Sequence, residues 1–156
     1  MGNVMDYLEW RGDLTFDQSP FNDVDNVILS QLAYVNFRDV IPSVQMNKGI
    51  TLKAAAQLFF DLHTEEELMQ DKSFIKDAPK LLKKAAQTNR FRDVILSDYV
   101  DMVDETLEKQ FGAFHIKLSP QCTYVAFRGT DDTLVGWKED FNMSFISPVP
   151  SQEDAV

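Results

Sequence analysis

The chain has 156 residues, of which 44% are hydrophobic and 26% are charged, a composition typical of one globular domain with a sizeable core. It carries 15 lysines and arginines against 25 aspartates and glutamates, a net charge of −10. This balance disfavours nucleic acid and anionic membrane surfaces as partners, because both attract cations. The sequence has no run of about 20 apolar residues that would predict a transmembrane segment. A single cysteine, Cys122, and an N-terminus unlike a secretory signal favour a cytoplasmic location.

The first 90 residues are predicted to be mainly helical, because their apolar residues recur with a period of about 3.6. Asn22, Thr51 and Asp77 are residue types that cap helix N-termini, and each precedes an apolar stripe. Pro79 falls in the first turn of the last of these helices, where its missing N–H is harmless. A shorter helix is expected over residues 3–10.

After residue 90 the hydrophobic period falls toward two, which predicts strands. The turn "SPQ" separates "KQFGAFHIKL" from "CTYVAF", so an antiparallel hairpin is expected. Residues 123–127 are apolar on both faces, which predicts a central strand covered on both sides. Such a sheet would have open edges, and no completed element follows it, so we expect it to continue beyond Val156.

The predicted central strand ends at Arg128-Gly129-Thr130. A glycine there allows a sharp turn, after which the N–H and hydroxyl of Thr130 would point at one spot, as an oxyanion hole requires. Arg128 would need a carboxylate partner, for which Asp140 is the first candidate and Asp131 the second. Spacing alone favours the alternative, a strand followed by an ordinary polar turn.

The segment "TYVAFRGTDDTLVGWKEDF" resembles class 3 lipases and their bacterial relatives in the α/β-hydrolase superfamily. The whole chain resembles the N-terminal half of a bacterial family of such lipase-like proteins. The resemblance implies an α/β fold in two parts. Residues 1–90 would be a helical, cap-like or lid-like region, and residues 91–156 would form the first strands of an incomplete α/β-hydrolase sheet.

The resemblance also implies roles for single residues. Thr130 would supply the oxyanion-hole donor, and Gly129 would make the turn that leaves room for it. Arg128 and Asp140 would brace the loop as an ion pair, and Trp137 would be a packing position. No G-x-S-x-G nucleophile elbow occurs in these 156 residues, so the chain contains no expected nucleophile and should be inactive alone.

The sequence thus predicts the N-terminal part of a serine hydrolase of lipase or esterase type, whose complete form would act on an ester or lipid-like substrate. The alternative is a non-catalytic interaction or regulatory module. A Cys122–His115 dyad across the hairpin is a minor third possibility. We expect no cofactor and no metal, because His63 and His115 are far apart in the sequence. The sequence gives no indication of the oligomeric state.

Overall fold

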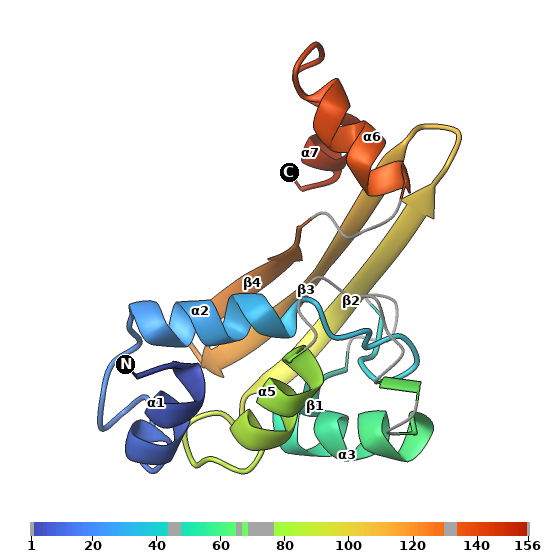
Figure 1. The fold of residues 1–156 in the computed structure, drawn as a ribbon. Helices are drawn as coiled ribbons and strands as arrows, with labels where there is room; N and C mark the ends of the chain where they lie inside the picture. Colours follow the sequence, from blue (N-terminus) through green and yellow to red (C-terminus); the bar gives the residue numbers. More distant parts are fainter. Residues whose placement is uncertain (1, 44–47, 65–66, 69–76, 130–133, 156) are drawn as a thin grey trace.

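The computed structural model of the chain describes residues 2–43, 48–64, 67–68, 77–129 and 134–155, and Figure 1 shows how their helices and strands are arranged. The strands of these residues form a four-stranded sheet in the order β1-β2-β3-β4. Every neighbouring pair is antiparallel. The strands are β1 (Ile50–Thr51), β2 (Ile95–Asp104), β3 (Lys109–Ser119) and β4 (Cys122–Arg128).

The helices that precede β2 form one layer against the sheet (Figure 1). They are α1 (Val4–Arg11), α2 (Asp23–Leu32), α3 (Leu52–Leu62) and α5 (Ala78–Ala85). Leu96 lies opposite Ile116, and Phe114 lies opposite Ala126, so these four buried side chains share one face of the sheet. That face meets the helices in one hydrophobic core, whose buried helical members include Ile28, Leu29, Leu32, Leu52, Phe59, Leu81 and Leu82.

Two further helices lie beside β3 at the far end of the sheet from α1, as Figure 1 shows: α6 (Leu134–Asn142) and α7 (Pro150–Asp154). The buried carboxylate of Glu139 on α6 joins them to the sheet. One of its oxygens accepts the backbone N–H of Gln110 at 2.9 Å, and the other accepts that of Ser151 at 3.1 Å. A helix side chain therefore satisfies a donor of β3 at a position that β4 does not reach.

Local capping explains where several helices begin. The Asn22 side chain accepts the N–H groups of Val24 and Asp25, and the Asp25 side chain accepts the N–H of Asn22, which makes a reciprocal capping box. Thr51 accepts the N–H of Ala54. These two predicted caps are confirmed. Asp77 is the N-cap residue of α5, as predicted, but its side chain makes no capping hydrogen bond.

The predicted hairpin of β3 and β4 is confirmed, but the predicted α/β-hydrolase sheet is wrong. Tight turns connect β2 to β3 and β3 to β4, and strands joined in this way must run antiparallel, whereas parallel strands need a long crossover. The expectation of a central, doubly covered β4 also fails among the described residues, where β4 is an edge strand. The assignment of residues 1–90 as a cap-like or lid-like domain is untested and stays a prediction.

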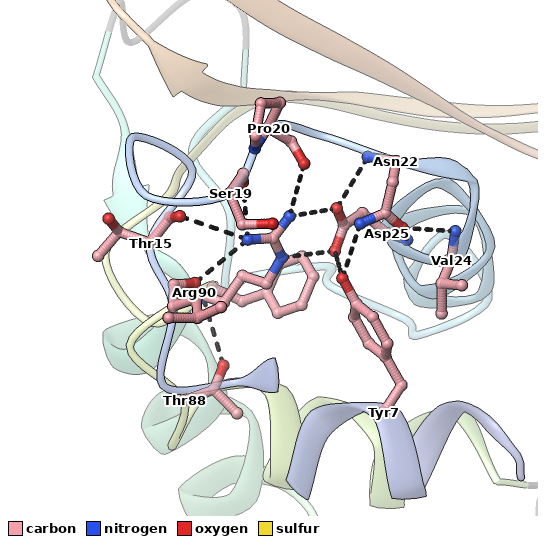
Figure 2. Close-up of polar contacts among 11 residues, drawn as sticks. Tyr7, Thr15, Ser19, Pro20, Asn22, Val24, Asp25, Thr88 and Arg90 are labelled. Carbon is pink, nitrogen blue, oxygen red and sulfur yellow. Dashed lines mark hydrogen bonds and ion pairs between the residues drawn. The ribbon is translucent and has the colours of Figure 1, made fainter. Parts of the chain in front are cut away.

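A fully buried ion pair between Arg90 and Asp25 connects the helical layer (Figure 2). Arg90 Nε donates to Asp25 Oδ1 at 2.6 Å, and its Nη2 donates to Asp25 Oδ2. The remaining N–H groups of the guanidinium donate to backbone carbonyls of one loop, those of Leu14, Thr15, Ser19 and Pro20. Tyr7 adds a hydrogen bond from its hydroxyl to Asp25 Oδ1 at 3.1 Å. The cation is therefore satisfied on every side without water.

The surroundings of Arg90 favour its charged form. Its guanidinium carbon lies 4.4 Å from the ring centroid of Phe16, a cation–π arrangement. The hydrogen bonds to Asp25 raise the pKa of Arg90, against the opposing effect of burial. A buried charge of this kind is tolerated because its counter-charge and hydrogen bonds are all in place.

Replacing Asp25 with asparagine tests this dependence. The Asp25→Asn variant keeps the shape but leaves the Arg90 cation buried without an anion, so we expect a loss of about 3–5 kcal/mol in the free energy of unfolding. Urea unfolding measures it. Asp77→Asn is the matched control, because Asp77 pairs with Lys80 on the surface, where loss of a pair has little effect. Equal stability of the two variants would contradict the prediction.

Candidate functional site at the open edge of the sheet

The outer edge of β4 is the first component of the candidate site. β4 pairs with β3 on one side, and no other strand of the described residues pairs with its other side. Half of its backbone N–H and C=O groups therefore face outward and can pair with a further strand. No charged side chain lies between Cys122 and Phe127 to oppose such pairing. We call this stretch, Cys122 to Arg128, the open edge.

The opposite edge of the sheet is protected instead. β1 pairs only with Ile95 and Leu96, so most of the outer edge of β2 has no neighbouring strand among the described residues. That part of β2 contains Asp98, Asp101 and Asp104, and the register shifts between Ser97 and Val100. Charged side chains and bulges are the usual devices that prevent edge-to-edge pairing. The two edges therefore differ in their capacity to accept a strand.

The second component is the sheet face that the helical layer leaves uncovered. Val125 is 40% exposed and Phe127 is 49% exposed, and the rings of Phe111 and Phe127 lie 6.2 Å apart. The register places apolar neighbours beside them on the same face. We call this set the open face: Val100, Met102, Phe111, Ala113, Val125 and Phe127. Contiguous exposed apolar side chains of this kind mark interaction sites.

The third component is the wall that faces β4 from the helical layer. The Phe21 ring lies 6.0 Å from that of Tyr124, and the Tyr124 hydroxyl donates to Asn26 Oδ1 at 2.8 Å. At the end of β4, a Cβ atom on Gly129 would lie 2.7 Å from the Tyr34 hydroxyl, closer than van der Waals contact allows. A side chain at position 129 would therefore displace the Tyr34 hydroxyl.

An ion-pair network fixes the end of β4. Arg128 Nη2 donates to Asp101 Oδ1 at 2.6 Å, and Arg38 Nη2 donates to Asp101 Oδ2 at 3.0 Å. In the register, Gly112 lies between Asp101 on β2 and Arg128 on β4. Because Gly112 has no side chain, the Arg128 side chain can cross β3 to reach Asp101.

The partner of Arg128 corrects the sequence analysis, which favoured Asp140 and then Asp131. The ion pair in the structure is with Asp101. The sequence could not show it, because the contact depends on the register of three strands. Asp131 lies outside the described residues.

The other predicted site residues are only partly described. Thr130 lies outside the described residues, so its oxyanion-hole role stays a prediction. Gly129 lies at the end of β4 against Tyr34, as described above. Trp137, predicted as a packing position, is 62% exposed on α6. Asp140 lies on the same helix, and the support roles of both residues are untested.

A polar cluster at the bulge of β2 was missed by the sequence analysis. His115 Nδ1 lies 2.9 Å from Asp98 Oδ2, and Ser97 Oγ donates to the same oxygen at 2.7 Å. The serine hydroxyl therefore bonds to the carboxylate rather than to the imidazole that could activate it. His115 lies opposite Val125 in the register, whereas Cys122 lies opposite Ser119, so the structure pairs His115 with Asp98 and not with Cys122. Asp98 has a φ of 58°, in the left-handed region that aspartate adopts more readily than most residues.

Comparison with known proteins finds similarity in the C-terminal part of the chain. Residues 85–156, which include β2, β3, β4, α6 and α7, match a family model described as Mbeg1-like. No lipase or α/β-hydrolase family matches, so the expected membership of a lipase-like family, and with it the description of the chain as a hydrolase, is wrong. Searches of curated proteins and of solved structures find no significant match.

Two general features bear on partners. None of the helices in the described part of the chain has the length and apolar character to cross a membrane. Among the same residues, no three or more histidine, cysteine or acidic side chains gather in a way that could hold a metal ion.

Gly112 offers a test of the network at the end of β4. A Cβ atom there would lie 3.1–3.2 Å from atoms of the Arg128 side chain. We expect Gly112→Val to displace Arg128 from Asp101 and to lower the free energy of unfolding by about 1–3 kcal/mol, as overpacking does. The neighbouring Ala113→Val is the matched control, since Ala113 lies on the open face. Equal urea midpoints for the two variants would show that Arg128 simply moves aside.

Asp98 provides a pH test. The hydrogen bond from Ser97, and secondarily the contact with His115, lowers the pKa of Asp98. A carboxylate with a lowered pKa stabilises the fold at pH values above its unfolded pKa, and this contribution is lost as the pH falls through the folded pKa. We expect the free energy of unfolding to fall more steeply with falling pH in the native protein than in the Asp98→Asn variant. Asparagine is the matched replacement because it also adopts a positive φ. Urea unfolding from about pH 6 to about pH 2 measures both; parallel profiles would contradict the prediction.

Proposed function

We propose that the chain is a non-catalytic interaction module that binds an extended segment of another protein as an additional strand on β4. The observation that carries this proposal is the open edge, an uncharged edge strand with unpaired backbone on its outer side among the described residues. In this binding mode, main-chain hydrogen bonds supply affinity and alternate side chains supply specificity.

The surroundings of the open edge support a strand as the ligand. A strand added to β4 would place half of its side chains beside Val125 and Phe127 on the open face. Its other side chains would lie near the Phe21 and Tyr34 wall. Side chains on both faces of the ligand would therefore bury part of their apolar surface against these neighbours, and such burial favours binding by about 25 cal/mol per Å².

Net charge favours a different protein over a second copy of this chain. Each copy carries a net charge of −10, so two copies repel each other. A partner segment with fewer acidic residues does not meet this repulsion. The cytoplasmic location remains part of the proposal, supported by the single, exposed Cys122.

The serine-hydrolase function has lost the resemblance on which it depended. The roles of Thr130 and Gly129 in an oxyanion hole, and the ester or lipid-like substrate, remain untested predictions. Nothing among the described residues favours them over strand addition.

A capped peptide tests the proposed function. The probe is acetyl-Thr-Val-Thr-Val-Thr-Val-Thr-amide, which is uncharged and alternates like a strand. We expect it to change the NMR amide signals of β4 and to protect them from hydrogen exchange. Val125→Lys should weaken binding about three- to eightfold, because Val125 is 40% exposed and burial of that remaining apolar surface is worth about 0.6–1.2 kcal/mol.

The matched control is Val103→Lys, which places the same substitution on β2, where Val103 is also exposed. It should leave peptide binding unchanged. Binding that Val125→Lys does not affect, or an absence of changes at β4, would overturn the proposal.

A further inference from the structure

The side chains beside the open edge also indicate which residue types a partner segment would carry. Successive side chains of a strand point to opposite faces, so a strand added to β4 would place every second residue on the open face. On that face its neighbours in β4 are Thr123, Val125 and Phe127. Val125 and Phe127 are exposed and apolar, so two of the three partner positions favour apolar residues.

The third position, beside Thr123, has a different neighbourhood. Thr123 lies opposite Lys117 of β3 on the same face. Strands in a sheet are about 4.8 Å apart, so the partner residue would lie about 10 Å from the Lys117 backbone, with only the small Thr123 between them. The long, flexible lysine side chain can cross that gap.

Lys117 is exposed and makes no ion pair with the described residues. By contrast, Lys109 at the other end of β3 pairs with Asp154 at 2.7 Å. The neighbouring polar side chain on β3, that of His115, contacts Asp98. β4 contributes no charged side chain between Cys122 and Phe127. This end of the open face therefore carries one unbalanced positive charge.

We infer that the partner of the open edge is a protein segment with one acidic and two apolar residues at alternate positions, which meet Lys117, Val125 and Phe127. The inference rests on the proposed function and adds the chemistry of the partner. A solvent-exposed ion pair contributes little affinity, so the acidic residue selects among partner segments more than it strengthens binding.

The experiment compares capped peptides that differ in one residue. For a strand antiparallel to β4 the pair is Thr-Val-Thr-Val-Thr-Glu-Thr and the same sequence with lysine in place of glutamate. For a parallel strand the pair is Thr-Glu-Thr-Val-Thr-Val-Thr and its lysine counterpart. Each is titrated by NMR against the native chain, Lys117→Glu and Lys53→Glu. Lys53 lies on α3, whose main contacts with the sheet are to β1 and β2 at the opposite edge from β4, so Lys53→Glu changes the net charge equally away from the site.

We expect the native chain to bind one glutamate peptide about two- to fivefold more tightly than its lysine counterpart, a ratio in the range of exposed ion pairs. Lys117→Glu should reverse the preference, Lys53→Glu should keep it, and added salt should reduce it. Equal binding of glutamate and lysine peptides, or a preference that Lys117→Glu leaves intact, would overturn this inference while strand addition stands. If no peptide changes the β4 amides, the proposed function fails instead.

Discussion

The arrangement of the helical layer depends on the buried contact between Arg90 and Asp25. Arg90 follows α5, Asp25 lies in the first turn of α2, and the carbonyls around the guanidinium belong to the loop between α1 and α2. The same carboxylate completes the capping box at Asn22, so one side chain begins a helix and neutralises a buried cation. Moving any of these segments would leave a charge or a polar group without a partner, and each such loss is expensive in a dry interior. The pair therefore specifies one relative position of these segments.

The helix α2 connects this arrangement of the helical layer to β4. Asn26 is one residue beyond Asp25, and it accepts the hydrogen bond from Tyr124 of β4. Tyr34, just beyond the same helix, lies against Gly129 at the end of that strand. At the other end of the molecule, Glu139 satisfies the β3 donor that β4 does not reach. The helical layer thus contacts β4 near both of its ends, and the ion pair of Arg128 with Asp101 holds its last residue.

Short-range features of the fold were predictable from sequence, and contacts across the sheet were not. Asn22 and Thr51 cap their helices because the groups involved lie within three residues, and the hairpin of β3 and β4 follows from one turn. The partner of Arg128 depends on the register of three strands and on a glycine in the middle one, which no local pattern shows. The pattern of β4 was interpreted as a central strand because apolar residues on both faces have the same signature whether the cover comes from the chain itself or from a partner. The resemblance to lipases suggested a sheet type that the tight turns between β2, β3 and β4 do not allow.

The contrast between the two borders of the sheet also limits what binding can produce. Open-ended assembly requires two complementary surfaces on every subunit, so that each bound molecule offers a place for the next. In this chain the aspartates and the bulge of β2 oppose strand pairing at one of these two surfaces. Recruitment on β4 would therefore end after a single event and yield a finite complex, even at concentrations where sheets with two equivalent borders grow into fibres.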